Sequence, residues 1–177
     1  MPKEMGMKCE ENKPKLLEAL KKCKEREIKK HLMMLEDCDP SEEKELENRF
    51  IFASLPYAHG EKQSSKHSVG EMFWLIVQND SEMDTSSIIQ NCSTPRLLST
   101  GSIEELHSLS LIGEGMVIIS FKPFNILNAV IALISSFYSF NCYYPKGHPK
   151  YVYALEYLML GTKEPLPMGV ENLISSL

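Results

Sequence analysis

The feature that most constrains this chain is a long uncharged segment in its C-terminal third. No charged side chain occurs between Lys122 and Lys146. Such a segment is too apolar to stay exposed to water, so it must lie in the core of a folded domain or span a membrane. Pro123 suits the first turn of a helix, and both interpretations place a helix in residues 123–144.

Small and polar residues within this segment favour the core interpretation. Asn128, Ala132, Ser135 and Ser139 follow one another at intervals of four, three and four residues, so on a helix they form a single stripe. We expect this stripe to let another element approach the helix closely. Asparagine is costly within a bilayer, and no clear positive flank is present, so a membrane span over residues 123–144 is the less favoured alternative.

The end of the uncharged segment, SSFYSFNCYYPKGHP, is dense in aromatic side chains. An asparagine here can end the helix in a left-handed conformation, and a proline then bounds the turn into a second helix with a leucine-rich face. We interpret this stretch as a structural corner in which aromatic side chains clamp two helices together. The corner residues are Phe137, Tyr138, Asn141, Tyr144 and Pro145.

The middle of the chain predicts two short strands. Residues 95–100 and 116–120 are strand-like, and the second run is β-branched and bounded by turn residues. Residues 102–111 begin with a cap-like Ser102 followed by two glutamates, which predicts a short helix. For the apolar run at 71–78, helix and buried strand are both open.

The N-terminal part is far more charged than the rest. Residues 1–50 contain 12 Lys/Arg and 13 Asp/Glu, and the whole chain has a net charge of −5. We expect a charged helical element over residues 1–55, a loop over 56–70 and a small module over 71–177. The predicted fold class is α+β and predominantly helical, with two short strands, two packed C-terminal helices and the charged N-terminal element.

Basic side chains near the N-terminus form a candidate surface for nucleic acid. Residues 8–30 carry nine Lys/Arg against five Glu. Such a patch can contact phosphates without reading base sequence, although a solvated helical face with internal ion pairs explains the charges equally well. The acidic chain as a whole has no global basic field. The candidate nucleic-acid-binding residues are Lys13, Lys15, Lys21, Lys22 and Lys24.

No sequence motif indicates catalysis, a metal or a cofactor. The chain has no C-x-x-C, no G-x-S-x-G, no G-x-G-x-x-G and no phosphate-binding lysine loop. Cys142 and His148 lie close in sequence, but no third group can be assigned to orient the histidine. We therefore predict no enzymatic activity, no metal site, no cofactor and no small-molecule substrate.

The cysteines bear on the cellular compartment. There are five, an odd number, and they are widely spaced. No apolar leader follows the first methionine. We therefore expect an intracellular protein with reduced thiols, in the nucleus or the cytoplasm.

Residues 4–20, EMGMKCEENKPKLLEAL, resemble the second half of a SAP-type motif. Lys13 corresponds to the lysine in the turn of that motif, and Leu16, Leu17 and Leu20 correspond to its second helix. The resemblance implies weak binding to DNA or RNA. Segments of this type also occur in proteins encoded by mobile elements.

Residues 94–177 are similar to the C-terminal region of uncharacterised animal proteins, which are described as like sterile-alpha-motif-domain proteins or as transposon-derived. The shared pattern is two short strands, a long apolar helix, a Tyr-Pro pair and a leucine-rich helix. Phe137, Tyr138, Asn141, Tyr144 and Pro145 match it. The resemblance implies a mobile-element-derived fragment and carries no known activity.

These observations favour a non-enzymatic interaction module that binds a protein partner or associates with itself. The first alternative is a weak, sequence-independent nucleic-acid binder that uses the N-terminal lysines. The second alternative is a membrane protein with a single span near residues 123–144.

Overall fold

The chain folds into six helices and four strands over the residues that the computed structural model describes, which are 2–36, 43–58, 69–78, 84–144 and 149–160. The first three helices are α1 (Pro2–Lys22), α2 (Arg26–Glu36) and α3 (Glu43–Ala58). A 3₁₀ turn, η1 (Val69–Met72), precedes strand β1 (Trp74–Val77) and helix α4 (Thr85–Gln90). Then come β2 (Arg96–Gly101), β3 (Leu106–Gly113), β4 (Met116–Ser120), α5 (Ile126–Ser139) and α6 (Pro149–Leu160).

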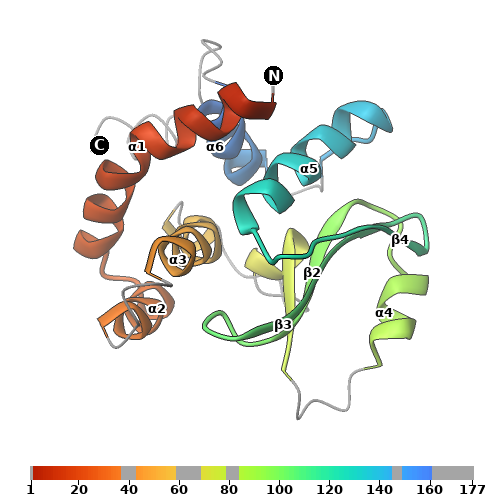
Figure 1. The fold of residues 1–177 in the computed structure, drawn as a ribbon, viewed down its shortest axis with the longest axis horizontal. Helices are drawn as coiled ribbons and strands as arrows, with labels where there is room; N and C mark the ends of the chain where they lie inside the picture. The colour runs from red at the N-terminus through yellow and green to blue at the C-terminus, as the bar shows by residue number, and fades with distance from the viewer. Residues whose placement is uncertain (1, 37–42, 59–68, 79–83, 145–148, 161–177) are drawn as a thin grey trace.

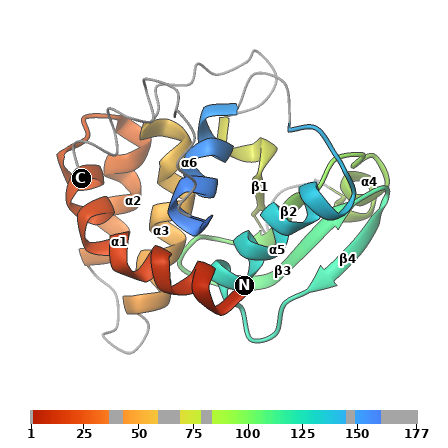
Figure 2. The same cartoon turned by 90° about the horizontal axis from the view of Figure 1, so that it is seen from above.

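Apart from α4, which lies beside the sheet, the helices and the sheet occupy different parts of the molecule. Helices α1, α2, α3 and α6 lie on one side and the sheet lies on the other, with α5 between them (Figures 1 and 2). A single hydrophobic cluster joins the two halves, with Leu20 of α1, Phe50 of α3, Leu109 of β3 and Leu133 of α5 among its members. The charged N-terminal element therefore shares its core with the C-terminal part.

The expected loop between these parts begins inside a helix. Helix α3 continues to Ala58, so residues 56–58 are helical. Residues 59–68 of the expected loop lie outside the described residues. The predicted division of the chain into two parts stays a prediction.

The sheet is mixed, with the strand order β1-β2-β3-β4. Strand β1 runs parallel to β2, whereas β2, β3 and β4 are antiparallel neighbours. The β3–β4 hairpin closes through Glu114 and Gly115, whose φ angles of 51° and 74° suit a type I′ turn. At Gly101, which has a φ of 104°, an added Cβ would lie 2.1 Å from the carbonyl oxygen of Glu105, so glycine is needed there.

The predicted fold class, predominantly helical with two short strands, is wrong because the described residues form a four-stranded sheet. The helix predicted at 102–111 is part of a hairpin. Ser102 accepts a hydrogen bond from the Glu105 amide at 3.0 Å, which is a cap-like bond, but here it closes the turn before β3. Leu109 and Leu111 are both buried, with Ser110 between them, and this two-residue period suits a strand that has neighbours on both sides.

Helix α5 is the predicted apolar helix, but its polar stripe faces the opposite way from our prediction. Asn128 and Ser139 are exposed, and Ala132 and Ser135 are half-buried. The stripe therefore lies toward water, where its polar groups keep their hydration. The closely packed face is instead the one that includes fully buried Ala129.

The predicted span over residues 123–144 is not supported. Helix α5 has 14 residues. Among the described segments, none of the helices combines the length and the hydropathy that a membrane crossing requires.

Both ends of α5 are capped by local hydrogen bonds. At the start, the Asn125 side chain accepts a hydrogen bond from the Asn128 amide at 2.8 Å. At the end, Asn141 has a φ of 51°, and the amide of Cys142 donates to the carbonyl oxygen of Phe137 at 3.0 Å. This is the pattern of a Schellman motif with asparagine in its left-handed position, as the sequence predicts.

The left-handed cap gives a direct test of how α5 ends. Replacing Asn141 by valine should lower the free energy of unfolding by about 1–2 kcal/mol, because a β-branched residue fits a positive φ poorly. Urea denaturation measures this change. The control variant Asn141→Gly should be as stable as the wild type or more stable, since glycine accepts this conformation. Equal destabilisation by both substitutions would contradict the proposed cap.

Candidate functional site

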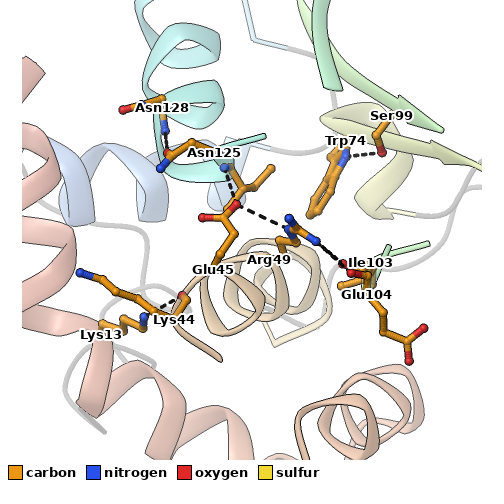
Figure 3. Close-up of polar contacts among 11 residues, drawn as sticks. Lys13, Lys44, Glu45, Arg49, Trp74, Ser99, Ile103, Glu104, Asn125 and Asn128 are labelled. Atoms are coloured by element: carbon orange, nitrogen blue, oxygen red, sulfur yellow. Dashed lines mark hydrogen bonds and ion pairs between the residues drawn. The ribbon is translucent and has the colours of Figure 1, made fainter. Parts of the chain in front are cut away.

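The lysines predicted to bind nucleic acid differ in how they are used by the fold. Lys13 is buried, and its ammonium donates to the carbonyl oxygen of Lys44 at 3.1 Å (Figure 3). The same ammonium lies 2.8 Å from a carboxylate oxygen of Glu47. These two contacts of Lys13 join α1 to α3. Lys22, in contrast, is exposed and pairs with Glu18 at 2.7 Å.

Three candidate lysines, Lys15, Lys21 and Lys24, are exposed and have no ion pair recorded with another described residue. Lys15 and Lys21 are six residues apart on α1, so they project about 120° apart around the helix axis. Lys24 follows the end of the helix. These side chains do not share one helical face, and binding of nucleic acid through them stays a prediction.

A half-buried carboxylate connects α3 to the start of α5. Glu45 accepts a hydrogen bond from the amide of Ile126 at 2.8 Å (Figure 3). The Nε of Arg49 lies 3.5 Å from the same oxygen, an ion-pair contact too long for a good hydrogen bond. Arg49 also donates through Nη1 to the carbonyl oxygens of Ile103 and Glu104, at 3.3 and 3.0 Å.

The electrostatics of Glu45 fit a structural role. Burial raises the pKa of this carboxyl group, while the Ile126 amide and Arg49 act to lower it. Through these contacts the carboxylate and the guanidinium together join α3, the β2–β3 turn and α5. Both charged groups are therefore engaged in contacts within the fold, which is a structural role.

The predicted aromatic corner lies where α5 meets α6. The ring of buried Phe137 meets that of Tyr144 edge to face, with centroids 5.0 Å apart. The hydroxyls of Tyr138 and Tyr144 both donate to Oε1 of Glu156, which is buried in α6. Burial, followed by the bond to Glu156, raises the pKa of Tyr144, so its hydroxyl stays a donor. Pro145 lies outside the described residues.

A small cavity of about 150 Å³ has a histidine, a residue type common in catalysis, in its lining. Its lining includes His31, Glu71 and Trp74. His31 Nδ1 lies 3.1 Å from the hydroxyl of Ser54, but Ser54 has no exposed surface. The pair therefore cannot present a nucleophile to a substrate from solvent, and it serves to satisfy buried polar atoms.

The indole of Trp74 is also satisfied within the protein. Its N–H donates to the hydroxyl of fully buried Ser99 at 2.9 Å, which ties β1 to β2 (Figure 3). In the part of the chain that the structure describes, no group of three or more His, Cys, Asp or Glu side chains could hold a metal ion.

Strand β4 exposes apolar side chains at an open edge of the sheet. Met116, Val117 and Ile119 retain 58%, 44% and 43% of their surface. One side of β4 pairs with β3, and no other described strand pairs with its second side. Figure 1 shows β4 at the outer margin of the sheet, with α4 beside it. This edge is the candidate binding surface.

The sequence indicated the strand at β4 but not its exposure. A run of five residues with four apolar side chains predicts a buried strand, since an exposed strand normally alternates apolar and polar residues. The signal that could have revealed an edge is the pair of charges that flank it, Glu114 and Lys122. The contacts of His31 with Ser54, of Glu45 with Ile126 and of Arg49 with Ile103 had no local signal, because these partners are distant in sequence.

Comparisons with family models, curated proteins and solved structures found nothing that matches this chain. The resemblances to the SAP-type motif and to the sterile-alpha-motif-domain-like or transposon-derived proteins therefore stay predictions. Residues 4–20 lie within the single helix α1.

Glu45 should be important for stability. The variant Glu45→Ala removes the acceptor of the Ile126 amide and the partner of Arg49, and we expect it to lower the free energy of unfolding by about 1–3 kcal/mol. Urea denaturation measures the change. The control Glu11→Ala removes an exposed carboxylate from α1 and should stay within about 0.5 kcal/mol of the wild type. Similar losses in both variants would contradict the role of Glu45.

Stability should also depend on the protonation of His31. Burial lowers its pKa below the ordinary value of 6.5, so below that pH the unfolded chain binds a proton more readily than the folded one. The free energy of unfolding should therefore fall as the pH is lowered from 7.5 to about 5.5, and His31→Gln should reduce this dependence.

Urea midpoints measured between pH 7.5 and about 5.5 give the size of the effect. This pH interval lies above the one in which most carboxylates titrate. The matched control is His107→Gln, because His107 is exposed and lies on β3. The control should keep the wild-type slope. An unchanged slope in His31→Gln would show that another group causes the dependence.

Proposed function

We propose that this chain is a non-enzymatic, intracellular protein-interaction module that binds an added strand at the edge of β4. The observation that carries this proposal is the exposure of three apolar side chains on a strand whose outer edge pairs with no other described strand. Such an edge offers backbone N–H and C=O groups to a partner strand, and its apolar side chains gain from burial.

The polar clusters support binding rather than chemistry. His31, Glu45, Arg49 and Glu156 are each engaged by another group of the fold. A catalytic group would need to reach a substrate with its reactive atom free to exchange a proton or attack. Each of these four side chains is therefore engaged within the fold, and we assign all four a structural role.

The compartment is part of this proposal. Cys23, Cys92 and Cys142 are free thiols. Cys92 is buried together with sheet residues against which α4 packs. Free thiols suit a reducing environment in the nucleus or cytoplasm.

Displayed peptides can test whether β4 accepts a strand. Random nine-residue peptides would be panned against protein that is immobilised sparsely, so that neighbouring copies do not meet. We expect enrichment of extended, β-branched sequences, because these fit a strand edge. The double variant Val117→Lys/Ile119→Lys should lose them, since lysines on an edge oppose pairing.

A matched control separates the edge from general stickiness. Met33 is an exposed apolar residue on α2, and Met33→Lys should retain the enriched peptides. If no peptides are enriched, or if the β4 variant binds them as well as the wild type does, the proposed function fails.

A further inference from the structure

We infer that the small cavity lined by His31, Glu71 and Trp74 binds a methylated ammonium group, either on a free quaternary ammonium compound or on a methylated lysine. The cavity is bordered by residues of α2, α3, η1 and β1. Strand β1 is at the opposite end of the described sheet from β4. The inference therefore adds a second site and does not depend on the edge of β4.

Aromatic residues make up much of the wall of this cavity. Phe52 and Tyr57 of α3 and Trp74 of β1 line it, together with His31 of α2. The faces of aromatic rings carry a negative electrostatic potential, which attracts a cation within about 6 Å of the ring centre, and tryptophan attracts it most. An occupant of so small a cavity lies close to all of its walls, so a cation there meets several aromatic side chains.

The charge of the cavity also selects a cation. Glu71 is the only charged side chain among the described residues that line it. His31 does not offset this charge, because burial lowers the pKa of its imidazole and keeps it neutral at pH 7. A carboxylate acts on a nearby cation through its field, so Glu71 need not bond to the ligand directly.

The remaining walls favour a methylated ammonium over an unmodified one. An unmodified ammonium is compact and strongly hydrated, and each of its three N–H groups needs an acceptor when it leaves water. Methyl groups remove that need, and they gain contact with the apolar side chains of Ala53, Ile76 and Ile103.

The size and the opening of the cavity suit such a group. A volume of about 150 Å³ is enough to hold benzene, and a trimethylammonium head is of similar size. Phe52 and Trp74 are buried, whereas Tyr57 and Glu71 are only half-buried. The cavity therefore reaches solvent beside the carboxylate, where a cation can enter.

The walls are held in place before a ligand binds. His31 Nδ1 lies 3.1 Å from the Ser54 hydroxyl, and the His31 ring meets that of Tyr57 edge to face with centroids 6.3 Å apart. The indole N–H of Trp74 donates to Ser99 at 2.9 Å (Figure 3). A site whose side chains are already fixed loses little conformational entropy on binding.

Trp74 allows binding to be measured directly, because it is the only tryptophan of the chain. Its emission would be followed at pH 7.5 as choline is added, and the methyl signal of choline would be followed by NMR. We expect saturable binding with a Kd in the millimolar range or tighter. The uncharged analogue 3,3-dimethylbutanol has nearly the same shape and should bind at least roughly tenfold more weakly, since it lacks the charge.

Two further probes identify the source of the ammonium group. Lysine and trimethyllysine, each capped at both ends to remove the backbone charges, would be titrated in the same way. Trimethyllysine should bind and unmodified lysine should not. Tighter binding of trimethyllysine than of choline would assign the site to a methylated protein side chain, and the reverse order would assign it to a free quaternary ammonium compound.

Variants locate the binding within the cavity. Glu71→Gln should weaken choline binding roughly tenfold by removing the charge. Ala53→Leu should abolish it by filling the space, and Tyr57→Leu should weaken it by replacing a ring with an aliphatic side chain. The control Glu114→Gln removes an exposed carboxylate from the β3–β4 turn and should bind like the wild type. Urea denaturation shows that each variant is folded.

Three results would overturn the inference. The first is that neither choline nor capped trimethyllysine binds at concentrations up to roughly 20 mM. The second is that the uncharged analogue binds as tightly as choline. The third is that folded Glu71→Gln and Ala53→Leu both bind like the wild type, which would place the ligand elsewhere. The first two comparisons need only the wild-type protein, so they decide the matter even if a variant fails to fold.

Discussion

Helix α5 must be covered on most of its surface, and the rest of the fold is arranged to cover it. Eight of its 14 residues are buried, and it contacts α1, α3, α6 and the strands β2 and β3. Burying each large apolar side chain contributes about 1.5–3 kcal/mol relative to exposure. The helical half and the sheet cannot separate without exposing this helix, so the charged N-terminal helices are needed for a stable core.

An uncharged helix still has polar ends, and the fold satisfies them in two ways. At the C-terminal end the helix closes on its own backbone through Asn141. At the N-terminal end, the carboxylate of Glu45 comes from α3 to meet the Ile126 amide. A helix N-terminus carries a partial positive charge that favours an anion, which offsets part of the cost of burying this carboxylate. The contact that caps α5 is thereby also one that fixes α3 against it.

Local signals explain which parts of this architecture could be predicted. The end of α5 was predictable because an asparagine in the left-handed position acts through its own backbone. The turn at Ser102 was misread because the same cap-like hydrogen bond can begin a helix or close a hairpin. Only the neighbouring strands decide between the two, and strand neighbours are not a local property.

Long-range contacts could not be predicted from the sequence. Glu45 and Ile126 are 81 residues apart, and His31 and Ser54 are 23 apart. Lys13 looks like any other member of a lysine-rich helix, yet its ammonium is buried against α3. The basic patch inferred from composition therefore included a lysine whose function is to hold two helices together.

The β4 edge differs from the usual treatment of exposed strands. Proteins commonly protect such edges with a bulge, or with a lysine, a proline or an inward-facing charge within the strand, and of these β4 has the bulge, at Ile118. Here the charges stand outside the strand at Glu114 and Lys122, and the run between them is uncharged. Charges in these positions do little to repel a strand that lies along the centre.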